Sequence, residues 1–331
     1  MEAPGAALAM DGERCVHALA VNAQCQACVA ACPRDALVLE DDGLGWRTEA
    51  CDACGLCVPA CPRGAMARTP PAHEAVVIHD DGAGFAACEK APVPHAASPL
   101  PCKHALGLRE LLKLAQIGLH HLTLLTGDCG SCPRARTGQM FEAALALHQS
   151  MRSSRGEDAI GVHLVQEPAA YHAAKRGSHG APARVDSRKR ALFTGLFRRS
   201  HARPRALPAS ALAAYAPVFD LEKCTACDAC ARICPDGALL RERGAAAGYR
   251  IFPELCSGCG LCVDLCDDEA MRLESPAAAA PSFVPLEARH CRACGVSFAW
   301  IAARPRDQQT ECPVCRKTTR TRQLFQVLRD P

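Results

Sequence analysis

Cysteine spacing is the feature of this sequence with the clearest chemical meaning. The 331 residues include 24 cysteines, and most of these are separated from the next cysteine by only two or three residues. Thiolates that close in sequence usually converge on one metal ion or one metal cluster rather than bridging distant parts of a fold. Aromatic residues make up only 4 % of the sequence. Bound metal is therefore expected to contribute much of the folding free energy.

The regular copy of the pattern lies between residues 218 and 274. The C-x2-C-x2-C-x3-C spacing occurs there twice, at Cys224, Cys227, Cys230 and Cys234 and again at Cys256, Cys259, Cys262 and Cys266. Three thiolates on one tight loop can bind three irons of a [4Fe–4S] cluster, and the fourth then ligates the neighbouring cluster. We predict two clusters with crossed ligands, one on Cys224, Cys227, Cys230 and Cys266 and one on Cys256, Cys259, Cys262 and Cys234.

Residues 10–70 carry a less regular copy. The second run is complete at Cys51, Cys54, Cys57 and Cys61, but the first run has only Cys25, Cys28 and Cys32, with Asn22 at the expected first position. Cys15 is predicted to replace the missing ligand on a longer loop. The predicted sets are Cys15, Cys25, Cys28 and Cys61 for one cluster and Cys51, Cys54, Cys57 and Cys32 for the other. Crossed ligation keeps two clusters close together, which suits an electron relay.

Both blocks resemble bacterial dicluster ferredoxins in these motifs. The segments between the motifs, residues 36–49 and 238–252, are expected to form a strand, a glycine turn and a second strand. Zinc on the same thiolates is the alternative, but zinc sites usually use two separated cysteine pairs. We expect an α+β fold, with two ferredoxin-like modules flanking a small α/β domain and a zinc-ribbon-like unit at the C-terminal end.

Residues 75–165 are predicted to form the small α/β domain. Apolar periodicity predicts strands over 75–82 and 121–129 and helices over 104–119 and 137–154, an order typical of a parallel layer. Sites in such sheets lie at the carboxyl ends of strands, where Cys129 and Cys132 are found.

This segment resembles the delta subunit of methyl-viologen-reducing hydrogenases. The resemblance rests on Cys102 before a helix and on the turn Gly127–Cys129. It implies a [2Fe–2S] cluster or another metal, with Cys88 and Cys132 as the remaining ligands. The alternative is that Cys88 and Cys102 are ordinary thiols, and that Cys129 and Cys132 alone form a redox or partial metal site.

The last segment, residues 287–331, carries two further cysteine pairs. Cys291, Cys294, Cys312 and Cys315 form two knuckles, which predict a zinc ribbon. A rubredoxin-type iron site is the alternative, because CRACG and CPVC are similar to rubredoxin knuckles. Zinc is favoured, because the rubredoxin insert is longer and richer in aromatics. The site would be structural or would form a docking surface with the basic residues 316–322.

Residues 170–217 are predicted to be a basic linker. Between 175 and 205 there are ten lysines or arginines and a single acid, Asp186. Residues Ser187–Arg199 are predicted to form a short amphipathic helix that docks onto a partner protein, with a solvated linker as the alternative. The segment resembles the start of the NapF-type accessory ferredoxin of periplasmic nitrate reductase. That resemblance implies service to a molybdenum-type oxidoreductase.

These features favour a cytoplasmic, multi-cluster electron-transfer protein that serves a redox enzyme. The alternative is a maturation or scaffold protein for a molybdenum-type oxidoreductase. No dinucleotide fingerprint, phosphate-binding loop or nucleophile elbow is present, so we expect no independent catalysis. A net charge of +3 and the absence of a leader or an apolar span give no reason to expect nucleic acid, a membrane or a small-molecule substrate.

Overall fold

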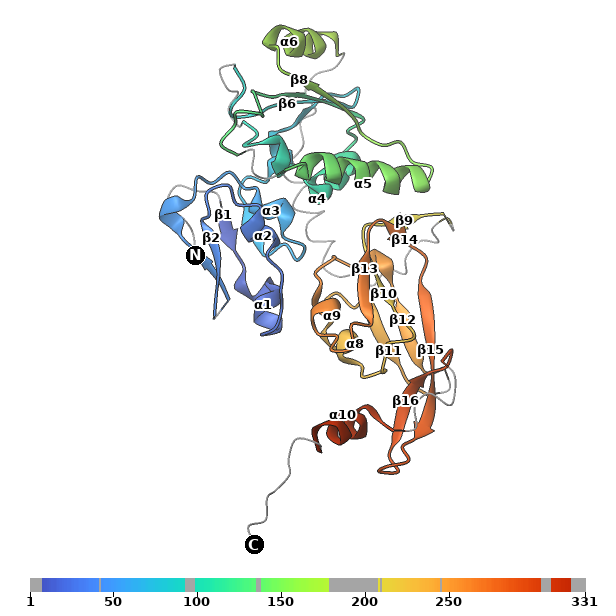
Figure 1. The fold of residues 1–331 in the computed structure, drawn as a ribbon. Coiled ribbons are helices and arrows are strands. Elements are labelled where there is room, and N and C mark those ends of the chain that lie inside the picture. Colours follow the sequence, from blue (N-terminus) through green and yellow to red (C-terminus); the bar gives the residue numbers. More distant parts are fainter. Residues whose placement is uncertain are drawn as a thin grey trace. The chain divides into compact units, whose positions relative to one another are not determined.

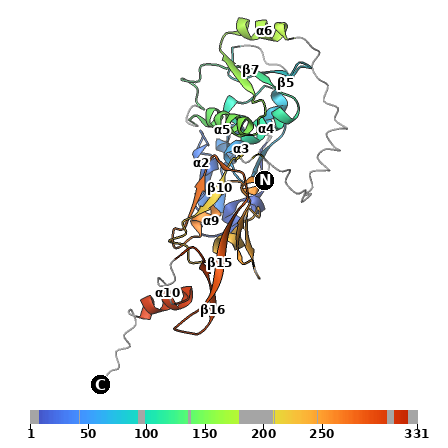
Figure 2. The same ribbon diagram turned by 90° about the vertical axis from the view of Figure 1, so that its right-hand side faces the viewer.

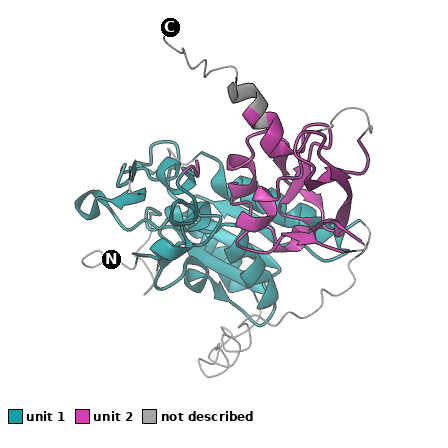
Figure 3. Cartoon of the chain, turned by 90° about the horizontal axis from the view of Figure 1, so that it is seen from below, with its two compact units in different colours: residues 1–21, 25–212 teal, residues 22–24, 213–331 magenta. Residues whose placement is uncertain are grey.

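The chain folds into two compact units with separate cores. The computed structural model describes residues 8–41, 43–92, 99–134, 138–178, 208, 210–244, 246–304 and 311–322. Unit 1 comprises residues 1–21 and 25–212, and unit 2 comprises residues 22–24 and 213–331 (Figure 3). Helices and strands are mixed in both units, as expected for an α+β protein (Figure 1). Within the described ranges, no helix has both the length and the apolar character needed to cross a bilayer.

Unit 1 begins with the first cysteine block. Its two ends meet in an antiparallel pair, β1 (Leu8–Met10) with β4 (Met66–Arg68). The predicted hairpin is confirmed as β2 (Leu37–Glu40) paired with β3 (Gly43–Trp46). Three one-turn helices lie between these strands: α1 (Val16–Leu19), α2 (Ala27–Ala30) and α3 (Cys57–Ala60). With so few residues in regular structure, the cysteines themselves make up much of the local core.

A four-stranded sheet forms the rest of unit 1. Its order is β5 (Val77–Ile78), β6 (Ala83–Ala87), β7 (His121–Leu125) and β8 (Gly161–Val165); the last three strands are parallel and β5 is antiparallel to β6. The strand predicted over 121–129 is β7, the strand predicted over 75–82 contains only β5, and β6 and β8 were not predicted. The helices are α4 (Leu108–Gln116), α5 (Met140–Ser154) and α6 (Pro168–Gly177). Figure 2 shows α4 and α5 on one face of the sheet and α6 on the other. Leu122 and Leu124 of β7 pack in the same core cluster as Leu111 of α4 and Phe141 of α5.

The α/β part extends beyond its predicted end at residue 165. Helix α6 begins with Pro168, whose fixed φ suits the first turn of a helix. Tyr171 of α6 is buried against Phe85 of β6 in an edge-to-face arrangement, with ring centroids 6.0 Å apart. The predicted linker therefore starts too early at residue 170, because its alanines form a helix held by this aromatic contact. The predicted docking helix, Ser187–Arg199, lies outside the described residues.

The first cysteine block and the α/β part share one hydrophobic core. Cys54 and Leu56 of the block pack in the same buried cluster as Leu106, Leu111 and Leu122. A Cβ added at Gly107, just before α4, would lie 2.4 Å from the Cβ of Pro59 in α3. The chain between the two parts is thus a connection inside one unit rather than a boundary between independent domains.

Unit 2 is built on the second cysteine block. Strand β10 (Ala216–Phe219) pairs with β13 (Met271–Glu274), and the predicted hairpin is confirmed as β11 (Leu239–Glu242) with β12 (Gly248–Ile251). The short helices are α8 (Ala229–Ile233) and α9 (Leu261–Asp264). The two-residue strands β9 (Leu212–Ala213) and β14 (Ala277–Ala278) lie at the ends of this block.

The C-terminal segment continues the sheet of unit 2. Strands β15 (Ser282–His290) and β16 (Ser297–Ile301) extend the hairpin in the order β11-β12-β15-β16. This segment therefore begins within β15 rather than at residue 287, because the open edge of β12 offers backbone groups that β15 satisfies. Trp300 of β16 is buried between the guanidinium groups of Arg289 and Arg304, 4.6 and 4.5 Å from its ring centroid. The last described element is α10 (Pro313–Arg322).

Candidate iron–sulfur and metal sites

Four hollows in the two cysteine blocks are each lined by four cysteines. The lining sets are Cys15, Cys25, Cys28 and Cys61; Cys32, Cys51, Cys54 and Cys57; Cys224, Cys227, Cys230 and Cys266; and Cys234, Cys256, Cys259 and Cys262. Each set combines three neighbouring cysteines with one from the other run, which is the crossed arrangement predicted from spacing.

The first hollow includes the irregular cysteine. Cys15 stands immediately before α1, whose first residue, Val16, is buried in the block. The His17 ring nitrogen Nε2 lies 2.8 Å from the carbonyl oxygen of Cys25, which ties the longer loop to the regular run. Burial, together with the charges of Cys61, Cys25 and Cys15, raises the pKa of Cys28 to about 12. The thiol of Cys28 therefore lies within electrostatic range of the three cysteines predicted to share its cluster.

The second hollow adjoins the first. Its loop is shaped by left-handed backbone at Ala53 and Gly55, with φ of 56° and 72°. The Cys54 amide donates to Oδ1 of Asp52 at 3.2 Å. Burial raises the pKa of Cys57, and its further causes include both its own set and Cys28 of the first set. The two cysteine sets of this block are therefore electrostatic neighbours.

Backbone amides donate to the sulfur of three cysteines that cross between sets. The donors are Ala36 to Cys32 at 3.3 Å, Ala65 to Cys61 at 3.2 Å and Ala270 to Cys266 at 3.1 Å. Each donor lies four residues after its cysteine. Such bonds stabilise thiolate charge and are one of the means by which proteins set the reduction potential of iron–sulfur clusters.

The second block repeats this arrangement with its own supporting contacts. Burial raises the pKa of Cys230, and the causes include Cys224, Cys227 and Cys266 of its own set and Cys262 of the neighbouring set. Asp228, in left-handed backbone between Cys227 and Cys230, accepts from Arg241 Nε at 3.0 Å and from the Tyr249 hydroxyl at 2.7 Å. These contacts fix the loop, since its carboxylate meets a cation and a buried hydroxyl at once.

The structure gathers the four cysteines of the α/β part at one end of its sheet. Cys88 follows β6, and its amide donates to the Leu125 carbonyl at the end of β7 at 2.8 Å. Cys102 precedes a 3-10 turn, and Cys129 and Cys132 stand on the turn after β7. Burial raises the pKa of Cys88, and the charges of Cys129 and Cys132 add to this effect. Burial likewise raises the pKa of Cys102 to about 11, with Cys88 and Cys132 as neighbouring charges.

The turn that carries Cys129 and Cys132 is ordered by its own side chains. Asp128 accepts from the Gly130 amide at 2.9 Å and from the Ser131 hydroxyl at 2.7 Å. A Cβ added at Gly127 would lie 2.3 Å from the Lys90 carbonyl oxygen, so only glycine lets this turn approach the segment after Cys88. Cys88 and Cys102 are buried, whereas Cys129 is exposed. The group thus has a buried side and a solvent-facing side.

The C-terminal cysteines are spaced for a single ion. The sulfurs of Cys291, Cys294, Cys312 and Cys315 all lie within 4.8 Å of one another, which holds for no other set of four among the described cysteines. The Cys294 and Cys312 sulfurs are 3.9 Å apart. A tetrahedral zinc with Zn–S of ~2.3 Å requires sulfurs about 3.8 Å apart. Amide donation from Cys312 lowers the pKa of Cys291 to about 6, which favours the thiolate that a metal needs.

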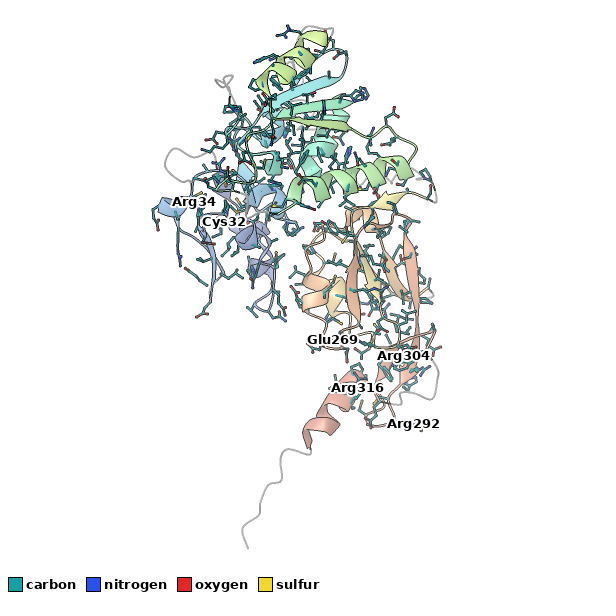
Figure 4. The ribbon with its side chains drawn as sticks, turned by 45° about the horizontal axis from the view of Figure 1, so that its top comes forward. Cys32, Arg34, Glu269, Arg292, Arg304 and Arg316 are labelled. Atoms are coloured by element: carbon teal, nitrogen blue, oxygen red, sulfur yellow. The ribbon has the colours of Figure 1, made fainter. Side chains whose placement is uncertain are left out.

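This C-terminal site is held against one hollow of unit 2. Arg304 Nη1 donates to the Cys224 carbonyl at 2.8 Å, and Arg316 Nη2 donates to Oδ1 of Asp268 at 2.9 Å (Figure 4). Asp268 also accepts from the hydroxyl of Thr225 at 2.8 Å, and both residues line the hollow. The two arginines therefore connect the segment beyond β16 to the Cys224 loop.

Two segments of the chain match known families. Residues 23–66 and residues 216–267 each match a family of 4Fe-4S dicluster domains. These matches support an iron–sulfur electron-transfer protein with ferredoxin-type domains. The first match begins after Cys15, so this predicted ligand lies outside it. No curated protein matches the chain.

Sequence reasoning missed the charged residues around the sites. Asp52, Asp228 and Asp268 were not singled out, nor were Arg134 and Arg241, and Arg316 was named only as part of the basic run 316–322. One signal was available, since Asp52 and Asp228 stand inside cysteine loops, where a carboxylate near thiolates needs a cation. The arginine partners are distant in sequence and could be identified only from the fold.

Proposed function

We propose that this chain is a multi-cluster electron carrier or electron-transfer subunit that serves a partner oxidoreductase. It would bind four [4Fe–4S] clusters through the sixteen cysteines that line the four hollows. The observation that supports this most is that each hollow is lined by one complete crossed set. When bound, such clusters exchange one electron at a time with little change in geometry.

The chain's own residues do the remaining work. They bury five of the sixteen cysteines, leave most of the others partly buried, donate amides to cysteine sulfur and keep the two sets of each block close together. In the α/β part, Cys88, Cys102, Cys129 and Cys132 would hold a further cluster or metal, with exposed Cys129 as the side open to a partner. Zinc at Cys291, Cys294, Cys312 and Cys315 would be structural.

The proposal is tested by metal analysis of protein purified without oxygen. Four clusters predict about 16 irons from the two dicluster domains, a broad visible absorbance, and bleaching by dithionite. Electron paramagnetic resonance of the reduced protein should show interacting [4Fe–4S] signals. A chain that binds zinc at these cysteines instead, with no acid-labile sulfide, would contradict the proposal.

The partner would be a molybdenum-type oxidoreductase, as the resemblance at Ser187–Arg199 suggests. A Phe193→Ala, Phe197→Ala double variant should lose a co-purifying oxidoreductase while its iron content stays the same. A maturation or scaffold role is the alternative, and it would be favoured by clusters that dithionite reduces slowly or not at all. Reduction within the dead time of a rapid-mixing experiment would favour the carrier.

A further inference from the structure

A buried arginine joins the second hollow of unit 1 to the four-cysteine group of the α/β part. Arg134 is 6 % exposed and follows Cys132 by two residues. Its Nε and Nη2 atoms each lie 3.1 Å from Oδ2 of Asp52, which lines the hollow of Cys32, Cys51, Cys54 and Cys57. A guanidinium that contacts one carboxylate through two nitrogens is held in a fixed orientation.

The same guanidinium also contacts both buried segments of the four-cysteine group. Nη1 of Arg134 donates to Oε2 of Glu89 at 3.0 Å and to the carbonyl of Pro101 at 2.7 Å. Glu89 follows Cys88 directly, and Pro101 precedes Cys102 directly. Arg134 therefore contacts residues that are adjacent in sequence to candidate ligands of both cysteine sets. Its charge acts on Cys54, Cys88 and Cys102.

The position of this charge has an electrical consequence. Reducing a cluster adds negative charge, and a buried cation nearby stabilises that charge more strongly than one in water does. Asp52 and Glu89 act in the opposite direction, and with Arg134 absent both would remain as anions close to the cysteines, screened only in part by water. Arg134 thus offsets two carboxylates at the point where the two cysteine sets approach each other.

We propose that Arg134 is a positioning residue for electron transfer in unit 1. It holds the Cys51–Cys57 loop against the four-cysteine group, and its buried charge raises the reduction potential of the cluster in the second hollow. This inference rests on the proposed function, since it needs a cluster in that hollow. Arg134 acts through Asp52 and does not itself line the hollow.

The test compares Arg134→Gln, Arg134→Lys and Arg34→Gln in the full-length protein. Redox titration is followed by electron paramagnetic resonance, and the signal altered in Cys54→Ser identifies the cluster concerned. Arg134→Gln should shift the midpoint potential of that cluster to more negative values, with iron content and the signals of unit 2 unchanged. Arg134→Lys keeps the charge and should remain near the wild-type potential.

Arg34 is the matched control. It lines the same hollow but is exposed (Figure 4). Water and salt screen an exposed charge, so Arg34→Gln should give a smaller shift that shrinks as salt is added. Unchanged potentials in Arg134→Gln, or an equal shift in Arg134→Lys, would overturn the inference. Wild-type protein without clusters would instead overturn the proposed function.

A second pair of variants covers the case in which Arg134→Gln loses iron. Asp52→Asn is compared with the double variant Asp52→Asn, Arg134→Gln, in which the partly exposed Asp52 carboxylate and the buried Arg134 cation are removed together. Glu89 is 41 % exposed, so water can solvate it in the double variant. Adding Arg134→Gln to Asp52→Asn should lower the reduction potential of the cluster in the second hollow, compared with Asp52→Asn alone. If it does not, or if the double variant also loses iron, Arg134 has only a structural role and the inference fails.

Discussion

At the scale of single residues, carboxylates inside the cysteine loops are paired with arginines from distant segments. Asp52 meets Arg134, and Asp228 meets Arg241, in both cases at 3.0–3.1 Å. An anion beside a cluster would disfavour its reduction, and pairing the anion with a cation would offset that effect. The two blocks reach this arrangement at different positions in their loops, since Asp52 follows the first cysteine of a run and Asp228 follows the second.

Cys15 is the single residue whose role is most open to test. Because it completes the lining of the first hollow, Cys15→Ser should lose about four irons per chain. Iron and sulfide analysis measures the loss, and Cys25→Ser shows how much iron is lost when a regular ligand is removed. Full iron content in Cys15→Ser would mean that another group completes this site.

Gly127 decides how closely the Cys129 turn approaches Cys88. Gly127→Ala should destabilise unit 1 by about 1–3 kcal/mol, because the new Cβ would meet the Lys90 carbonyl at 2.3 Å. Denaturant titration measures the loss. Gly177→Ala, where a Cβ meets nothing within 4 Å, is the control and should change stability little. Equal effects in the two variants would contradict the close approach.

At the scale of elements, the sheet of unit 2 brings two kinds of cysteine site together. The hairpin β11–β12 belongs to the second block, and β15–β16 leads to the C-terminal cysteines. Trp300 of β16 supports Arg304, which in turn contacts the Cys224 carbonyl. The strand pairing thus explains why a segment so far along the chain reaches a cluster hollow.

Removal of Arg304 tests this connection. Arg304→Ala should leave iron and zinc contents unchanged but speed the bleaching of unit 2 clusters by oxygen, because the Cys224 loop loses a contact. Stopped-flow absorbance measures the rate. Arg272→Ala is the control, since its ion pair with Glu274 is exposed, and exposed pairs contribute little. Identical bleaching rates in the two variants would rule out a protective role for Arg304.

At the scale of the whole molecule, the shared core of unit 1 predicts that its cysteine block and its α/β part are destabilised and unfold together. Leu106 is fully buried beside Cys54 and Leu56 of the first block. Leu106→Ala should therefore cost about 2–5 kcal/mol and reduce hydrogen-exchange protection in both the cysteine block and the β6–β8 sheet. Mass spectrometry of the exchanged peptides measures this. In the control, Leu286→Ala should affect unit 2 alone. Loss of protection confined to the sheet would show that the two parts unfold independently.

The sequence by itself determined the local chemistry of this protein. Cysteine spacing predicted four sets of four, and the same four sets line the four hollows. It also predicted both hairpins, strand β7 and helices α4 and α5, because ligand spacing and apolar periodicity are properties of short segments. These features need no knowledge of distant contacts.

Only the tertiary structure decided which distant residues surround each site. Arg134 is 82 residues from Asp52, and Arg304 is 80 residues from Cys224. Nothing in the local pattern marks these partners, since a long cationic side chain can serve many positions. The end of the α/β part was likewise misplaced, because α6 depends on the packing of Tyr171 against Phe85. Contacts of this kind depend on how the sheets and loops pack in three dimensions, which the local sequence pattern does not specify.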